Sequence, residues 1–300
     1  MTAPRVSVVL KRSSWRRWVE EEKDPRVKRL LAEGDETVSR MGPGHREHQA
    51  TVEEVKRAFD ELGVKASWHE HASTFLAEPA CELVVTVGGD GTLLSASHSV
   101  DSVPILGINS APRDSVGFFC AATRADARAA IERALAGKMR ASMLSRMRVE
   151  LRGRTVHDRV LNEALFCHAC PAATSRYILE LDRGRGRAVR EEQRSSGFWI
   201  GPAAGSTAAQ RSAGGRVLPF GSRALQLVVR EPYTPSGKLR LEKVLVPERG
   251  RLVVLCKMRD ARVFLDGVHT EVRCGLGDEL VFRRSEESLC VLGLARLRAP

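Results

Sequence analysis

Apolar and polar positions follow two recurring patterns over the first 140 residues. Short apolar runs that end in a polar or glycine residue lie at 6–10, 81–87 and 104–109. The segments 48–62 and 125–135 carry apolar side chains at helical spacing, and 92–99 follows a glycine loop as a further helix. The apolar runs predict buried strands, and the periodic segments predict helices that cover them. This alternation predicts a doubly wound α/β domain built on a parallel sheet.

The pattern changes after about residue 140. Short runs bounded by glycine, proline or charged turns lie at 147–151, 157–166, 176–181, 197–201, 225–230, 251–256, 261–265 and 279–282. Such a series predicts an antiparallel, β-rich second domain. We therefore expect an α/β domain over 1–140, a β-rich domain over 141–280, and a tail over 281–300 that returns to the first domain.

Composition and charge exclude several classes of protein. The formal net charge of +11 would favour polyanions, but the arginines are spread along the chain and only 5% of the residues are aromatic. Base stacking is therefore poorly supported, and we expect no nucleic-acid binding. The chain has no apolar run long enough to span a membrane and no signal-peptide pattern, so we expect a cytoplasmic protein. Cys167 and Cys170 have no second Cys/His pair at a zinc spacing, and we interpret the seven cysteines as structural thiols.

The first candidate for chemistry is the glycine loop behind the apolar run 83–87. Gly88, Gly89 and Gly91 would let backbone N–H groups approach a phosphate closely, and Thr92 begins the following helix. Asp90 lies among them, although a carboxylate beside a phosphate is unfavourable unless it accepts a proton or binds a metal. We interpret Asp90 as a catalytic residue. The alternative is that Asp90 merely caps the helix.

Two further motifs lie in the second half. Asn162 and Glu163, between apolar neighbours on a predicted strand, are side chains that could bond sugar hydroxyls and base edges. The segment 203–215 is richer in information, because its hydroxyl side chains at Ser206, Thr207 and Ser212 predict a phosphate-binding turn that opens a helix. A flexible linker is disfavoured because the alanines of this segment favour helix.

In that order and at those separations, the three motifs resemble the NAD kinase family over roughly residues 80–290. The resemblance implies a kinase that transfers a phosphoryl group from ATP or polyphosphate to the 2′-hydroxyl of the adenosine ribose of NAD or NADH, which yields NADP(H). It implies that Asp90 is the general base and that Gly88, Gly89, Gly91 and Thr92 lie along the donor phosphates. Phosphoryl transfer also implies Mg²⁺ or Mn²⁺ at the donor oxygens, with no protein side chain assigned as its ligand.

The resemblance further implies a set of dinucleotide-binding residues. Asn162 and Glu163 would hold the dinucleotide, with Thr207, Ala208 and Ser212 close to its sugars and base. Weaker candidates stand in the neighbouring segments that also look like the family. These are Asn109, Phe118, Ser196, Ala209 and Asp266.

The chain departs from the family pattern at three places. Ser196 stands where the family usually has an Asp that would bind the nicotinamide end, and Ala209 stands in place of the usual Tyr. The segment 110–116 is longer or altered before Gly117. In its serine pair, Ser195 and Ser196, the chain resembles the plant-type NADH kinase branch. Loss of a negative charge near the nicotinamide would favour the neutral reduced ring over the cationic oxidised ring.

Two alternatives remain open from the sequence. A lipid kinase of the diacylglycerol or sphingosine type shares the glycine loop and a β-rich second domain, but it should have a large apolar groove. A nucleotide-binding regulator without turnover is the other alternative, and the retention of Asp90 counts against it. We expect NAD or NADH and ATP as small-molecule ligands, no membrane partner, and a homodimer or homotetramer.

Overall fold

The computed structural model describes residues 5–78, 80–235 and 237–294. Within that range the chain forms two compact units, one from residues 5–142 and 289–294 and the other from residues 143–288. Each unit has its own core. We describe them separately.

The first unit is built on a parallel sheet. Its strands follow the order β5-β4-β3-β1-β2, and Val291, near the end of β17 (Glu279–Leu292), also pairs with the start of β4. The chain leaves β1 toward β2 on one side and returns to β3 on the other, so the carboxyl ends of β1 and β3 mark the point where such sheets bind ligands. The strands are β1 Val6–Leu10, β2 Ala66–His69, β3 Leu83–Gly88, β4 Ile105–Asn109 and β5 Cys120–Thr123.

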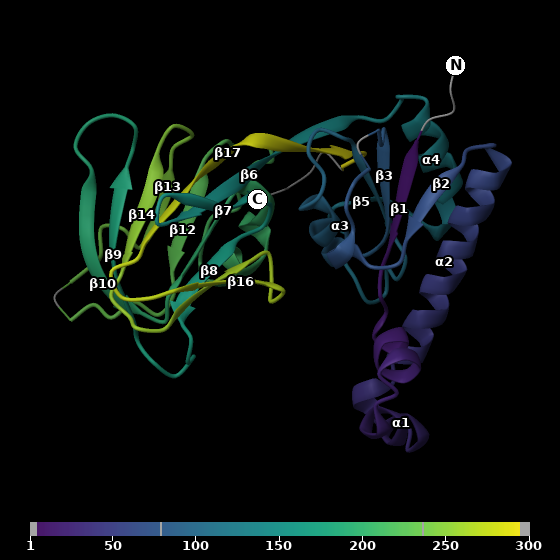
Figure 1. Ribbon diagram of the computed structural model, residues 1–300, viewed down its shortest axis with the longest axis horizontal. Helices are drawn as coiled ribbons and strands as arrows, with labels where there is room; N and C mark the ends of the chain where they lie inside the picture. Colours follow the sequence, from purple (N-terminus) through teal and green to yellow (C-terminus); the bar gives the residue numbers. More distant parts are fainter. Residues whose placement is uncertain (1–4, 79, 236, 295–300) are drawn as a thin grey trace. The chain divides into compact units, whose positions relative to one another are not determined.

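Helices cover both faces of this sheet. Figure 1 shows α2 and α4 on one side and α3 on the other, and the apolar residues of α2 and α4 share a core with the strands. The predicted doubly wound α/β architecture is therefore confirmed. The helices are α1 Pro25–Ala32, α2 Met41–Glu61, α3 Asp90–Ser97 and α4 Ala127–Leu135, with short helical turns η1 Arg16–Glu21, η2 Glu36–Val38, η3 Ala72–Thr74 and η4 Arg124–Asp126.

Three elements of this unit were absent from the sequence prediction, and one was too short. Helix α2 begins at Met41 rather than at 48, because Gly42, Pro43 and Gly44 obscure its start in the sequence although they fit the first turn. Strands β2 and β5 are only four residues long and partly exposed, so they carry little apolar signal. Helix α1 is only eight residues long and buries none of them, so it adds nothing to the predicted core.

The second unit consists of two antiparallel sheets that share one core. One sheet has the order β10-β9-β14-β17, with β6 beside β17 and β7 beside β6; the other has the order β13-β12-β11-β8-β15-β16. Its strands are β6 Ala141–Leu151, β7 Arg154–Val160, β8 Ala164–His168, β9 Ser175–Asp182, β10 Val189–Ser195, β11 Phe198–Gly201, β12 Leu225–Val229, β13 Lys243–Val246, β14 Arg251–Cys256, β15 Ala261–Leu265, β16 Thr270–Cys274 and β17 Glu279–Leu292.

The rings of Phe166, Tyr177, Phe198 and Phe282 pack together between these sheets. The predicted antiparallel β-rich domain is confirmed, and Figure 1 shows its strands in teal, green and yellow. The two helical turns of this unit, η5 Ala203–Thr207 and α5 Ala209–Ser212, follow β11 directly. Among the described residues, no helix is both long and apolar enough to cross a membrane.

Candidate active site

Asp90 lies in the first unit at the carboxyl end of β3. The strand ends at Gly88, Gly89 is the N-cap of α3, and Asp90 is the first residue of that helix. The Asp90 side chain is half-buried, and its Oδ1 accepts a hydrogen bond of 2.7 Å from the backbone N–H of Phe119. Within the described chain, Oδ2 has no hydrogen-bond partner. One carboxylate oxygen is therefore fixed while the other is available for a proton.

The interpretation of Asp90 as a helix cap is not supported by its geometry. The N-cap of α3 makes no side-chain cap hydrogen bond, and the carboxylate bonds across to the segment before β5 instead. The neighbouring Cys120 thiol remains protonated, because burial and the charge of Asp90 raise its pKa to about 12. The N-terminus of a helix stabilises the negative charge of a carboxylate at this position, and a general base must carry that charge before it accepts a proton.

Asn109 and Phe118 lie on the segment that follows β4. Asn109 is buried, its Oδ1 accepts from the N–H of Ala111 at 3.2 Å, and its Nδ2 donates to the carbonyl of Ser115 at 3.0 Å. Phe118 is half-buried and packs edge-on against Phe119, whose N–H binds Asp90. Both candidates therefore lie close to the glycine loop at 88–92 that contains Asp90, and the amide of Asn109 holds the loop that follows it.

Asn162 and Glu163 lie in the second unit, and the expectation that they belong to a strand is wrong. The predicted run 157–166 is divided into β7 and β8, and residues 161–163 form an elbow between them. The reason is the Asp266 carboxylate, which accepts backbone hydrogen bonds from Leu161 at 2.7 Å, Asn162 at 2.7 Å and Glu163 at 3.1 Å. These N–H groups point to a carboxylate instead of to a neighbouring strand.

The segment after β11 supports the same elbow from another direction. A Cβ on Gly205 would collide with the backbone of Asn162, so only glycine permits this close approach. Gln210 donates from Nε2 to the Asn162 carbonyl at 3.3 Å and accepts from the Nε2 of Gln226 at 3.1 Å. The second and third motifs are therefore brought together within one unit.

The elbow leaves two buried polar atoms without a partner. Asn162 Oδ1 and Glu163 Oε2 are both buried and accept no hydrogen bond from the described chain. Unpaired buried polar atoms are costly, and they are characteristic of a place where a ligand supplies the missing partner. Burial, and then the charge of Asp266, raise the pKa of Glu163 to about 8. Near neutral pH its carboxyl group is therefore largely protonated and can donate as well as accept.

The third motif forms less helix than the sequence predicted. Its hydroxyl and alanine residues form the 3₁₀ turn η5 and the single turn α5, which ends at Ser212. Ser206, expected to face a phosphate, is buried; its Oγ donates to the Ala203 carbonyl at 2.8 Å and accepts from the Leu218 N–H at 2.9 Å. The remaining candidates of this motif are partly or fully exposed. These are Thr207, Ala208, Ala209 and Ser212.

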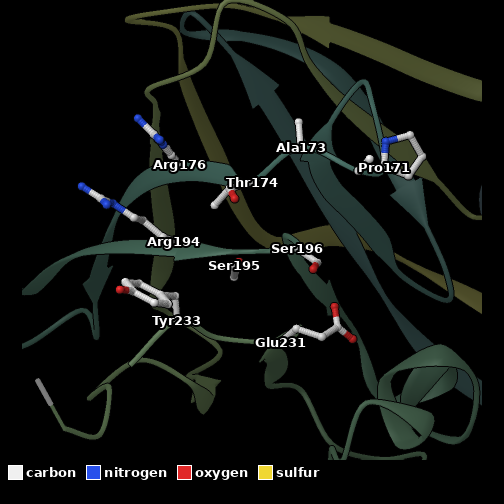
Figure 2. A pocket seen from close by; sticks show the side chains of 10 residues that line it. Pro171, Ala173, Thr174, Arg176, Arg194, Ser195, Ser196, Glu231 and Tyr233 are labelled. Carbon is white, nitrogen blue, oxygen red and sulfur yellow. The ribbon is translucent and has the colours of Figure 1, made fainter. Parts of the chain in front are cut away.

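Ser196 lines a pocket of about 310 Å³ within the second unit. Figure 2 shows Ser196 and Glu231 at one end of this pocket and Arg176 and Arg194 side by side at the other. The two arginines are directly opposite each other on the β9–β10 pair. Ser195 faces the interior instead, where its Oγ lies 2.6 Å from the Tyr177 hydroxyl.

The side chains that the structure describes do not form a metal site of their own. No group of three or more His, Cys, Asp or Glu side chains in the described ranges is arranged to hold a metal ion. A divalent cation can also take ligand atoms from a bound molecule and from water. Phosphate oxygens are suitable ligands for Mg²⁺, which usually keeps few protein ligands.

Two features of this site were missed in the sequence. The role of Asp266 as the anchor of the elbow had no local signal, because an Asp-Gly pair is also a common hairpin turn, and Asp266 does lie at the β15–β16 turn. Gln210 was visible only as one polar residue in a motif of small residues. Gln210 is buried in the structure. A buried polar side chain points to a specific hydrogen-bonding role, but the sequence alone does not show that this residue is buried.

In sequence, the chain is similar to NAD kinases and NADH kinases. The family described as "ATP-NAD kinase N-terminal domain" matches residues 18–139. The chain is 34% identical over 255 residues to a probable NADH kinase of Oryza sativa subsp. japonica, with 78% of each chain covered. It is also 34% identical over 239 residues to an NADH kinase of Arabidopsis thaliana, with 73% of this chain and 75% of the other covered.

Solved structures agree with the fold. An NAD kinase from Archaeoglobus fulgidus in complex with ATP has a TM-score of 0.67 at 22% identity, covering 97% of this chain and 94% of that one. Yeast NADH kinase complexed with NADH has a TM-score of 0.71 at 13% identity, covering 99% of this chain and 85% of that one. At these identities the two structures support the architecture described above.

Proposed function

The chain belongs to the NAD kinase family, and from this premise we propose that it phosphorylates the 2′-hydroxyl of the adenosine ribose of NAD or NADH to give NADP(H). The donor is ATP or polyphosphate. The observation that carries the proposal for this chain is the elbow at Asn162 and Glu163, whose buried, unpartnered oxygens can accept hydrogen bonds from the hydroxyl and amino groups of a ligand. A dinucleotide has such groups on its riboses and adenine.

Asp90 is proposed to act as the general base. Its Oδ2 accepts the proton of the 2′-hydroxyl as the ribose oxygen attacks the terminal phosphorus of the donor. The new oxygen–phosphorus bond forms while the bond to the leaving phosphate chain breaks, so ATP leaves as ADP. The hydrogen bond from Phe119 holds the carboxylate during this transfer without occupying Oδ2.

The loop around Asp90 is proposed to bind the donor phosphates. Gly91 has open space where a side chain would project, whereas Thr92 and Ser115 fill the space beside Gly88 and Gly89. Thr92 lies in the first turn of α3. The N-terminus of a helix favours anions through its dipole and its N–H groups. When bound, Mg²⁺ or Mn²⁺ would neutralise the negative charge of the donor oxygens.

The second unit is proposed to bind the dinucleotide. Asn162 and Glu163 bond its hydroxyl and amino groups, with Thr207, Ala208 and Ser212 near its sugars and base. Ala209, Asn109, Phe118 and Asp266 have supporting roles in this proposal, Asp266 through the elbow that it anchors. The redox form of the substrate is proposed to depend on Ser196, whose neutral side chain offers no carboxylate to a cationic nicotinamide. This would favour NADH.

The two alternatives have less support. The plant relatives and the two solved structures named above are NAD or NADH kinases, and none of them is a lipid kinase. The pocket that contains Ser196 is polar, with two arginines and several hydroxyl groups, which does not suit a lipid acyl chain. A regulator without turnover would gain nothing from Asp90, because a carboxylate beside phosphates weakens binding.

A coupled assay tests the proposal directly. Purified protein is incubated with NAD or NADH, each combined with ATP, GTP or polyphosphate in the presence of Mg²⁺, and NADP or NADPH is measured with a specific dehydrogenase. We expect product with at least one redox form and one donor, and more product with NADH. Absence of product in every combination would refute the proposal, and phosphorylation of a lipid mixture would favour the alternative kinase.

We further propose a homodimer or homotetramer that acts in the cytoplasm. Light scattering coupled to size-exclusion chromatography measures the assembly, for which a mass of 33.0 kDa would indicate a monomer. Fractionation of cells of the source organism tests the location.

A further inference from the structure

Besides the Arg176 and Arg194 pair of the second unit, arginines also gather in the first unit, around a pocket of about 670 Å³. Three segments line it: the start of α2, the loop after β4, and the short helix η4 that precedes α4. Four arginines and two acidic residues face it. They are Arg40, Arg46, Arg113 and Arg124, with Glu47 and Asp114.

The arginines of this pocket outnumber their partners. Asp114 pairs with Arg40 at 3.6 Å. In the part of the chain that the structure describes, Arg46, Arg113 and Arg124 form no ion pair or side-chain hydrogen bond. The first turn of α2 contributes no acidic residue, and its N-cap makes no side-chain hydrogen bond. Four arginines against two acidic side chains give the pocket an excess of positive charge, which favours a bound anion.

The loop that carries Arg113 is held in place rather than free. The carbonyl of Ala111 accepts from the N–H groups of Asp114 and Ser115, both at 3.0 Å. The Ser110 Oγ lies 3.0 Å from Nδ1 of the buried His48, and Asn109 binds the loop at both ends of its amide. Arg113 therefore projects from a fixed backbone, which reduces the entropy lost when an anion binds.

The same loop contacts the catalytic loop. The N–H of Ser110 donates to the carbonyl of Gly88 at 3.1 Å. The Ser115 hydroxyl occupies the space that a Cβ on Gly89 would need. This is also the segment, 110–116, that departs from the family pattern in the sequence. The pocket and the glycines next to Asp90 are therefore joined by one short stretch of this chain.

We propose that this pocket binds a chain of phosphoryl groups. Three unpaired guanidinium groups from three different segments match an anion that repeats its charge along its length, whereas a single carboxylate would satisfy only one of them. The shared chemistry is an oligophosphate, supplied by a nucleoside triphosphate or by inorganic polyphosphate. The inference rests on the proposed function, because it assigns part of the donor to residues outside the glycine loop.

Binding of inorganic tripolyphosphate and of ATP tests this without turnover. Isothermal titration calorimetry compares the unchanged protein with the double variant Arg113→Ala/Arg124→Ala, at one fixed salt concentration and with no dinucleotide present. We expect tripolyphosphate binding to weaken roughly tenfold to a hundredfold, since each arginine lost removes a charge-assisted hydrogen bond. Thermal unfolding of both proteins shows that the fold is kept.

The matched control is Arg185→Ala/Arg187→Ala, which removes two exposed arginines from a turn of the second unit. The control should bind tripolyphosphate as the unchanged protein does. If the test variant loses affinity for tripolyphosphate only, the pocket binds inorganic polyphosphate. If it loses affinity for ATP, with or without a loss for tripolyphosphate, the pocket binds the triphosphate of the nucleotide donor. Equal binding by all three proteins, or equal loss in the control, would overturn the proposal. NADH binding and kinase activity are measured separately, so an inactive protein that still shows the selective loss would refute only the proposed function.

Discussion

Asp266 Oδ1 accepts a hydrogen bond of 2.7 Å from the backbone N–H of Asn162, 104 residues earlier in the chain. The same carboxylate also binds the N–H groups of Leu161 and Glu163, and Asp266 itself has a positive φ of 51°. A non-glycine residue in the left-handed region is strained, and such strain persists only where the surroundings hold it. The β15–β16 turn therefore positions the elbow that presents Asn162 and Glu163.

Asp266→Asn should impair dinucleotide binding more than chemistry. An amide replaces one acceptor oxygen by a donor, so at least one of the three N–H groups faces an NH₂ group instead of an oxygen. We expect KM for NADH to rise about tenfold or more with a smaller change in kcat, as expected for the loss of a hydrogen bond to a charged group. Steady-state kinetics measures both values. Asp260→Asn, an exposed aspartate just before β15, is the control, and a KM equal to that control would contradict the positioning role.

Asp90→Asn should affect chemistry more than binding. The amide oxygen of asparagine can still accept the Phe119 N–H, so the local fold should persist, but the side chain can no longer take up a proton. We expect kcat to fall at least about a hundredfold, because general-base catalysis typically contributes ~10²–10⁴. NADH affinity, measured by fluorescence titration, should remain close to that of the unchanged protein. Near-normal turnover would mean that another group accepts the proton.

The α/β unit was largely predictable because its central strands can be recognised from short stretches of sequence. The residues of β1, β3 and β4 are buried throughout, which gives continuous apolar runs, and the parallel arrangement follows from the helices between them. The glycine loop was predictable for the same reason, since it must follow such a strand. The sequence analysis did not predict β2 and β5, which are short strands at the two ends of this row of parallel strands.

The candidate site of the second unit was predictable in its residues but not in its shape. The run 157–166 is continuously compatible with a strand, and only the distant Asp266 breaks it at 161–163. Similarly, the hydroxyl of Ser206 looked available in the sequence but serves the fold through Leu218. Both outcomes depend on contacts between residues far apart in the chain, which local patterns do not encode.

Ser196→Asp tests the origin of the proposed preference for NADH. The substitution places a carboxylate in the pocket of Figure 2, where Arg176 and Arg194 are the cations and Glu231 is the one acid among the lining residues. A negative charge there should attract the cationic nicotinamide of NAD and leave the neutral ring of NADH unaffected.

We therefore expect the ratio of kcat/KM for NAD to that for NADH to rise several-fold, which is about 1 kcal/mol of differential interaction. Ser196→Asn is the matched control, because it adds similar volume without charge. An equal change of the ratio in both variants would indicate a steric effect, and no change in either would remove Ser196 from the account of specificity.

The raised pKa of Glu163 makes the stability of the second unit depend on pH. Burial, and then the charge of Asp266, raise this pKa from 4.5 to about 8. The folded protein therefore keeps a proton that the unfolded chain releases above its ordinary pKa. The resulting stabilisation is complete below about pH 4.5 and is lost as the pH rises toward 8.

Glu163→Gln should remove this dependence, because glutamine resembles the protonated carboxyl group at every pH. Between pH 5 and 8 the free energy of unfolding of the unchanged protein should fall, relative to that of the variant, by at most about 1.4 kcal/mol per pH unit. Guanidinium unfolding followed by tryptophan fluorescence measures the difference. Glu286→Gln removes the same charge from an exposed position and should leave the slope unchanged. If Glu163→Gln and Glu286→Gln give parallel pH profiles, the carboxyl group of Glu163 is ionised in the folded protein and can only accept hydrogen bonds from the dinucleotide.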